Sequence, residues 1–213
     1  MTPDQFPSHP VQFTVDYPDR PLNRLTTFFR LIVIIPIAIV LGLLAGGEAA
    51  FGTQLEASTY SASFGGLLVL PPLLMVLFRQ KYPRWWLDWN VNLLKFQYRV
   101  GVYFSLLRDE YPSTDEDQAV HIDVPYPDMP HELNRWLPLV KWLLVIPHYI
   151  VLFFLGIGAF VAVIIAWFAI LFTGRYPHGL FNYIVGVMRW SARVMAYAFL
   201  LTTDWYPPFT LAE

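Results

Sequence analysis

The ionisable side chains that lie within or beside apolar sequence are the first candidates for chemistry. They are Arg30, Asp88, Lys95, Arg99, Lys141, His148, Arg189 and Arg193. Charged groups in a membrane are costly, so such residues mark functional sites by default. Catalysis would need an acid and a base, or a nucleophile and a base, at matched positions. Asp88 has no second carboxylate at such a position, and Ser191 has neither a neighbouring base nor a glycine elbow.

His148 is the one polar residue in the middle of a long apolar segment. It follows Pro147, and no second histidine or carboxylate lies nearby at metal-ligand spacing. A hydrogen-bonded structural histidine is the simpler interpretation, with a polar site inside the membrane as the other. The chain has no cysteine and no phosphate-binding glycine loop. We therefore predict a protein that is not an enzyme and has neither metal nor cofactor, with a lipid-modifying enzyme as a weaker alternative.

A repeat organises the elements that position these residues. Segments that begin at Val11, Asn23 and Leu77 align with segments that begin at Val120, Asn134 and Leu171. Repeats at this scale usually mean one supersecondary unit used twice. The repeat predicts two domains, residues 1–112 and 113–213, with an acidic linker at about residues 109–119. That linker is interpreted as a solvated connector kept away from anionic lipid.

Composition indicates a membrane protein. Apolar residues make up 56% of the chain and charged residues 14%, whereas a soluble domain has about a quarter charged. The net charge of −2 argues against a nucleic-acid partner. The N-terminal residues lack a basic region followed by an apolar core, so we expect no cleavable signal peptide.

Four apolar runs predict two transmembrane hairpins. They are Phe28–Ala45, Phe64–Phe78, Trp142–Leu155 and Ile157–Phe172. In the second copy, Gly156 and Gly158 are expected to mark the turn between the two arms. A full crossing takes about 20 residues, and these arms are short. Because the arms are short, hairpins that thin the bilayer or dip into it without crossing remain the alternative, but crossing hairpins are preferred.

Basic residues predict the orientation. Lys and Arg flank the outer ends of both hairpins, whereas the loop between the first two runs contains Glu48 and Glu56 but no basic residue. The positive-inside rule then places all basic residues, both termini and the linker in the cytoplasm.

Two amphipathic segments follow the hairpins. Arg84–Arg108 has a polar stripe at helical spacing on an aromatic and aliphatic helix, and His178–Leu201 has a matching stripe. Tryptophans beside the first stripe favour a helix that lies in the membrane interface. Spanning is the competing interpretation, but it would place the basic residues of the second copy outside.

Short extended segments precede each hairpin. Val11, Phe13, Val15 and Tyr17 alternate with polar residues, and the segment from Val120 alternates in the same way. This period of two predicts half-buried strands. Because two isolated strands are marginally stable, we expect them to pair with each other or with another chain.

Taken together, the predicted fold is an all-α membrane protein with two tandem copies of a transmembrane helical hairpin plus an interfacial amphipathic helix. Each copy begins with a short β-like segment. The phrases "LTTFFRLIVIIP" and "IAWFAILFTGRYPHGLFNYIVGVMRWSARVMAYAFLLTTDWYPPF", with the doubled "DYP" and "PYP", resemble a bacterial integral-membrane family known as domain of unknown function 4389.

The resemblance extends from about Val11 to Phe209 and is most specific over Phe168–Phe209. The first copy departs from the family pattern: "RQKYPRWW" replaces "TGRYPHGL", Pro71-Pro72 replaces Ile165-Ala166, and the hairpin loop is longer. The resemblance implies a multi-pass protein of the bacterial cytoplasmic (inner) membrane. The family name implies no activity.

The preferred function is a non-enzymatic integral membrane module, an accessory or scaffold subunit at the cytoplasmic interface. Its expected partners are membrane lipids and either a protein partner or further copies of itself. Candidate residues for binding anionic headgroups or the partner are Arg24, Arg30, Lys95, Arg99, Arg135, Lys141, Arg189 and Arg193. The alternative function is a small-solute or ion transporter or channel component, working as an oligomer, because prolines inside apolar runs can break helices around a midplane site.

Overall fold

The computed structural model describes residues 9–45, 71–114, 116–127 and 133–212. The α-helices are α1 (Arg24–Val33), α2 (Ile35–Ala45), α4 (Arg84–Phe104), α5 (Pro138–Leu144), α6 (Ile146–Thr173) and α7 (His178–Met195). Two short π-helical segments are η2 (Met75–Arg79) and η3 (Ala196–Leu200). The strands are β1 (Gln12–Val15) and β2 (Val120–Asp123). The described part of the chain is therefore mostly helical.

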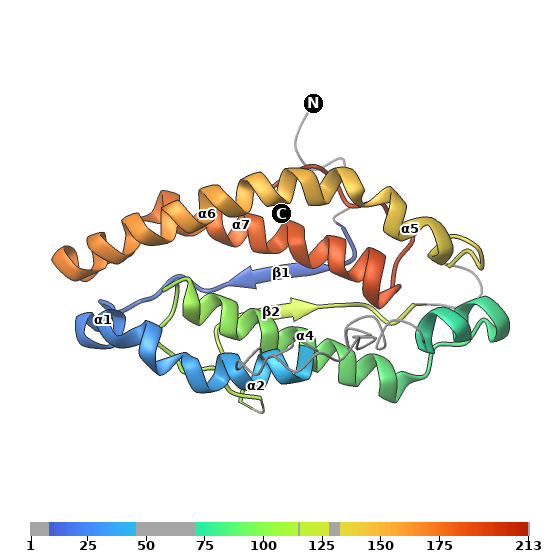
Figure 1. Ribbon diagram of the computed structural model, residues 1–213, viewed down its shortest axis with the longest axis horizontal. Helices are drawn as coiled ribbons and strands as arrows, with labels where there is room; N and C mark the ends of the chain where they lie inside the picture. The colour runs from blue at the N-terminus through green and yellow to red at the C-terminus, as the bar shows by residue number, and fades with distance from the viewer. Residues whose placement is uncertain (1–8, 46–70, 115, 128–132, 213) are drawn as a thin grey trace, which may run out of the picture.

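The two predicted strands pair with each other. β1 and β2 are antiparallel, with Phe13 opposite Ile122 and Val15 opposite Val120. Phe13 and Ile122 also occupy the same place in the two aligned segments, so the pairing is unchanged when the segments are exchanged. The strands run through the middle of the molecule, between α6 and α7 on one side and α2 and α4 on the other (Figure 1).

Each strand packs on the amphipathic helix from the other half of the chain. β1 contacts α7, and β2 contacts α4. One core therefore contains side chains from both halves, including Phe13, Val102, Ile122, Ile170 and Ile184. Because each strand packs on the helix of the other half, the apolar side of the sheet is buried, as a two-stranded sheet requires for stability. The division into residues 1–112 and 113–213 stays a prediction from the repeat.

The two predicted amphipathic helices are present. α4 and α7 begin directly after the extended residues Pro83 and Pro177, as expected because proline disfavours the helical conformation for the residue before it. Beyond α4 and η3 the chain turns at Leu106 and Leu201, with φ angles of 64° and 56°. These two leucines follow the aligned helices, so both halves leave their helix through a left-handed residue.

The predicted turn at Gly156 and Gly158 is wrong. α6 is continuous from Ile146 to Thr173, so the two expected arms are one helix. Each interior glycine costs a helix only about 1 kcal/mol relative to alanine, and the flanking residues are strongly apolar and helix-compatible. The chain breaks earlier, at Val145, and Pro147 then lies in the first turn of α6, where its missing N–H is tolerated.

The predicted first hairpin is only partly within the described residues, since its loop and most of its second arm fall in 46–70. Its first arm is divided into α1 and α2. The axes of Arg24–Arg30 and Ile35–Leu41 differ by 51°. Asn23 caps α1 through its side-chain oxygen, which accepts from the backbone N–H of Leu25. The structure therefore shows a bent first arm, and the first hairpin as a whole stays a prediction.

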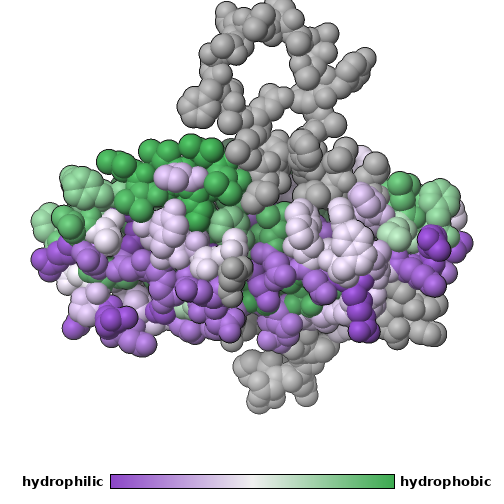
Figure 2. All heavy atoms as spheres, turned by 90° about the horizontal axis from the view of Figure 1, so that it is seen from below, coloured by the Kyte–Doolittle hydropathy of each residue, from purple (hydrophilic) through white to green (hydrophobic). Residues whose placement is uncertain are grey.

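Apolar and polar residues lie on opposite sides of the molecule. Figure 2, seen along an edge, shows hydrophobic residues gathered along one long side and hydrophilic residues along the other. Many large apolar side chains of α1, α2, α5 and α6 are exposed, among them Phe28, Ile32, Ile35, Trp142, Phe153, Phe154, Phe160 and Phe172. The long axis of the molecule is parallel to this division (Figures 1 and 2).

Candidate functional site

Arg30 is buried and held inside the first half of the chain. Its guanidinium forms an ion pair with Asp109 and donates to the backbone oxygens of Tyr103 and Arg108. It also lies over the ring of Tyr103, 4.3 Å from the ring centre. The other carboxylate oxygen of Asp109 accepts from the backbone N–H of Asn23 at 2.7 Å. Asp109 therefore joins the start of α1 to the loop after α4.

Lys141 has the same surroundings in the second half. Its ammonium lies 2.7 Å from Oδ1 of Asp204 and donates to the backbone oxygen of Thr203 at 2.6 Å. It lies 4.7 Å from the centre of the Tyr197 ring. Asp204 Oδ2 accepts from the backbone N–H of Asn134 at 2.6 Å. The buried cation, its carboxylate, the backbone oxygen, the tyrosine ring and the asparagine N–H therefore recur in both halves, at positions that the repeat aligns.

Arg30 and Lys141 were expected to reach headgroups. The structure buries both, with exposed side-chain fractions of 2% and 0%, against carboxylates of their own half. Sequence reasoning missed the two carboxylates. A signal was present, since "DEYP" at Asp109 and "DWYP" at Asp204 follow the two amphipathic helices at matching distances.

Three further candidates bind backbone or lie inside the protein. Arg189 donates to the backbone oxygens of Phe13 and Leu211, which ties α7 to β1 and to the C-terminal segment. Arg193 is 3% exposed. Arg99 donates to the backbone oxygen of Ser113 in the linker. Arg189 and Arg99 therefore hold β1, the C-terminal segment and the linker in place, and Arg193 is buried inside the protein.

Arg24 and Arg135, at the starts of the two aligned segments, are exposed. Arg24 donates to the backbone oxygen of Phe172 near the C-terminal end of α6, where a cation interacts favourably with the helix dipole. They are the candidates that the structure leaves available to an outside ligand, together with Lys95.

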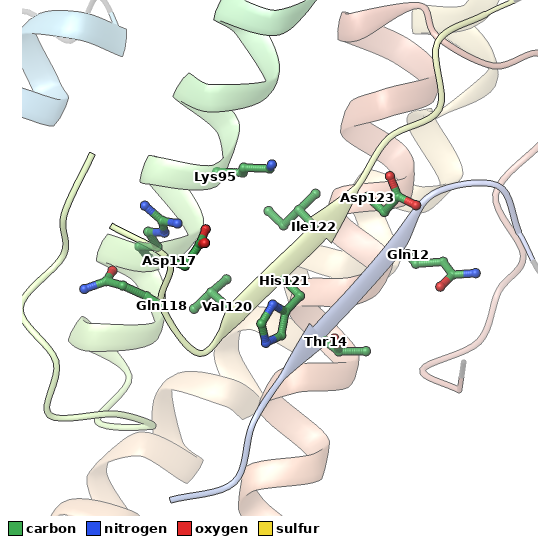
Figure 3. Close-up of a pocket in the computed structure, with 10 residues that line it drawn as sticks. Gln12, Thr14, Lys95, Asp117, Gln118, Val120, His121, Ile122 and Asp123 are labelled. Carbon is green, nitrogen blue, oxygen red and sulfur yellow. The ribbon is translucent and has the colours of Figure 1, made fainter. Parts of the chain in front are cut away.

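Lys95 borders a polar pocket of about 420 Å³ beside the sheet. Figure 3 shows Lys95 on α4, Gln12 and Thr14 on β1, and His121 and Asp123 on β2. Asp117 and Gln118 of the linker close one end, and Arg99 also lines the pocket. The pocket is therefore lined by both basic and acidic side chains.

His148 lies in an aromatic cluster and is fully buried. Its Nδ1 accepts from the indole N–H of Trp190 at 3.0 Å. Its ring stacks on Phe209 with centroids 4.0 Å apart and lies 4.8 Å from Tyr206. Because Nδ1 accepts, the neutral ring carries its proton on Nε2. Within the described residues, Nε2 has no hydrogen-bond partner. The arrangement supports a structural histidine.

The described residues contain no group of three side chains that could hold a metal ion. α6 is long and apolar enough to cross a membrane, and only 11% of its most apolar stretch is buried. A core helix of a soluble protein would be mostly buried, so the exposed apolar surface of α6 is typical of a helix that contacts a membrane or another protein. The small residues Ala162 and Ala166 face the protein interior instead.

Neither the curated proteins nor the solved structures include a match to this chain. The family described as "Domain of unknown function (DUF4389)" matches residues 136–210, the segment that contains α5, α6, α7, Lys141, His148 and Asp204.

Proposed function

We propose that this chain is a non-enzymatic membrane module of the bacterial inner membrane that lies in the plane of one leaflet. Its apolar side would enter the hydrocarbon, and its polar side would bind a partner protein and anionic headgroups at the cytoplasmic surface. We further infer that its halves are tandem copies of one unit, since the buried cation, carboxylate and tyrosine recur in both.

The observation that carries the proposal is the division of the surface along the long axis. Hydrophobic residues occupy one long side and hydrophilic residues the other (Figure 2). α6 has 28 residues, which is about 42 Å at 1.5 Å per residue, more than the roughly 30 Å hydrocarbon core. If α6 crossed, the polar sheet face with Thr14, Asp16 and His121 would extend into the hydrocarbon, at high cost. Lying in plane avoids that cost.

Basic residues support the same placement. Arg135 precedes α5, and Arg175 follows α6. A crossing α6 would separate these arginines by the bilayer, against the positive-inside rule. An in-plane α6 leaves both on the cytoplasmic side, where each could meet anionic lipid, worth about 1 kcal/mol per cation near the surface.

Single-cysteine labelling tests the placement, because the chain has no native cysteine. Arg135→Cys and Arg175→Cys would be treated with an impermeant maleimide on right-side-out and inside-out vesicles. We expect both to react only in inside-out vesicles. His121→Cys serves as the polar-side control and Phe160→Cys, on the exposed apolar side of α6, as the protected control. Labelling of the two ends from opposite sides would show that α6 spans and would overturn the in-plane proposal.

The accessory role is tested by native mass spectrometry of the chain extracted from its own membrane. A second protein at fixed stoichiometry is expected. Substituting Thr14 and His121 by Glu on the sheet face should release it, whereas Phe160→Leu on the apolar side should not. Extraction of the chain alone, or as a homo-oligomer only, would contradict the role as an accessory subunit.

A further inference from the structure

A groove of about 570 Å³ opens between α2, α4 and the linker. Ile37 and Val40 of α2 and Phe96 of α4 form its apolar end. Tyr111 and the linker residues Thr114 and Glu116 form its polar end. This volume is within the range of small-molecule sites, roughly 300–1,000 Å³.

The corresponding place in the second half is filled by the protein itself. Ile37 and His148 each follow the aligned prolines, and Phe96 aligns with Trp190. Tyr111 and Tyr206 occupy the same place in "DEYP" and "DWYP". They also make the same ring contact, Tyr111 with Tyr103 at 5.6 Å and Tyr206 with Tyr197 at 5.8 Å. The two places can therefore be compared residue by residue.

In the second half, the side chain of Phe209 occupies the position that corresponds to the groove. Its ring stacks on His148 at 4.0 Å and meets Trp190 edge-on at 5.5 Å. The residue three positions after Tyr111, as Phe209 is after Tyr206, is Thr114. Threonine is too small to occupy the same volume. Among the residues that the structure describes, none takes the place of Phe209 in the first half. The apolar recess there therefore lacks the dispersion contacts that Phe209 provides in the second half.

We propose that this groove binds a single-chain amphiphile with an uncharged, hydroxyl-bearing head, whose apolar chain takes the place that Phe209 takes in the second half. Ile35 and Ile39 are exposed on α2 beside the apolar end, so the chain can enter from the hydrophobic side of the molecule. The head would then lie against the polar end, where Tyr111, Thr114 and Glu116 offer acceptors for hydroxyl donors.

The charge of the residues that line the groove determines which head group it can bind. Among the described residues that line the groove none is basic, and Glu116 is acidic. A phosphate or carboxylate head would therefore be repelled rather than held. The inference deepens the proposed function, on which it rests for the source of the ligand, since the amphiphile would come from the leaflet in which the chain lies.

The test uses the full chain in a steroid-based detergent, which has no acyl chain to compete. Monolauroylglycerol is titrated and counted by native mass spectrometry. We expect one bound molecule, at least tenfold weaker binding of lauric acid, and loss of binding in Thr114→Phe, which supplies the missing ring. Thr26→Phe makes the same change at an exposed position of α1, away from the groove, and should bind normally. Phe209→Ala should open the corresponding site in the second half, so that the number of bound monolauroylglycerol molecules rises from one to two.

The outcomes separate this inference from the membrane placement. Unchanged binding in Thr114→Phe, or no binding by the unaltered chain, overturns the groove proposal. Flotation of Thr114→Phe with liposomes is measured in parallel. If Thr114→Phe floats with liposomes but no longer binds monolauroylglycerol, both proposals are supported. If it floats and still binds monolauroylglycerol, only the groove proposal is overturned. If Phe209→Ala fails to fold, as its circular dichroism would show, the comparison of Thr114→Phe with Thr26→Phe decides alone.

Discussion

The ammonium of Lys141 lies 2.7 Å from the carboxylate of Asp204. It also donates to the backbone oxygen of Thr203, which lies 62 residues further along the chain. Burial lowers the pKa of Lys141, and the carboxylate of Asp204 opposes that shift. The cation is tolerated inside because a carboxylate, a carbonyl oxygen and the ring of Tyr197 replace its hydration shell. The pair joins α5 to the segment that follows η3.

Asp204→Ala is expected to destabilise the protein by about 3 kcal/mol, because it leaves a buried ammonium without its counter-ion. Thermal unfolding followed by circular dichroism in detergent measures the change. Lys141→Met combined with Asp204→Asn removes both charges and should recover more than half of the loss. A change below about 0.5 kcal/mol in Asp204→Ala would mean that water already compensates Lys141, contrary to its burial.

Two glycines of α6 should respond oppositely to alanine. A Cβ at Gly158 would lie 2.5 Å from the hydroxyl oxygen of Tyr183, and that hydroxyl donates to the backbone oxygen of Leu155. Gly158→Ala should therefore cost about 1–2 kcal/mol by displacing a stiff, bonded ring. A Cβ at Gly156 meets nothing within 4 Å, so Gly156→Ala should be neutral or stabilising in a continuous helix. Destabilisation by Gly156→Ala would indicate a turn there.

Gln80 and Gly174 occupy aligned positions, and both have left-handed backbone, with φ angles of 46° and 72°. Glycine adopts this conformation without strain, whereas glutamine does not. Gln80→Gly is expected to stabilise the protein by about 0.5–1 kcal/mol, measured by the shift in melting temperature. Gln97→Gly, the same substitution inside α4, should instead destabilise it by a similar amount. Equal effects at both positions would refute the explanation.

Acid should loosen the segment before β1 through His9. Its Nδ1 accepts from the backbone N–H of Val11, and burial is the main cause that lowers its pKa, with a smaller contribution from Arg193. The folded state therefore favours the neutral ring. The stabilisation is complete above the unfolded pKa of about 6.5 and is lost as pH falls from there towards the lowered folded value.

Hydrogen exchange at Val11 should accordingly accelerate between pH 7 and pH 5, after correction for the intrinsic pH dependence of exchange. His9→Gln keeps a neutral acceptor and should remove the acceleration. His121→Gln, at an exposed histidine beside Asp16, should retain it. Acceleration that persists in His9→Gln would assign the effect to another group.

Local periodicity in the sequence determined much of the secondary structure. The alternation around Phe13 and Ile122 predicted strands that pair, and the stripes after Pro83 and Pro177 predicted α4 and α7. These patterns are readable because each depends on neighbours a few residues apart. The strongly apolar composition likewise predicted a membrane protein, and the structure contains one helix, α6, that is long and apolar enough to cross a membrane.

Only the tertiary structure decided where the charges go and how α6 runs. Asp109 and Asp204 lie 79 and 63 residues from the cations that they pair with, so no local pattern joins them. The glycines of α6 favour a turn locally, but Tyr183 packs against Gly158 in the space that a side chain would fill, and the helix is continuous there. Long-range contacts have this effect because burial and pairing energies of several kcal/mol exceed local preferences of about 1 kcal/mol.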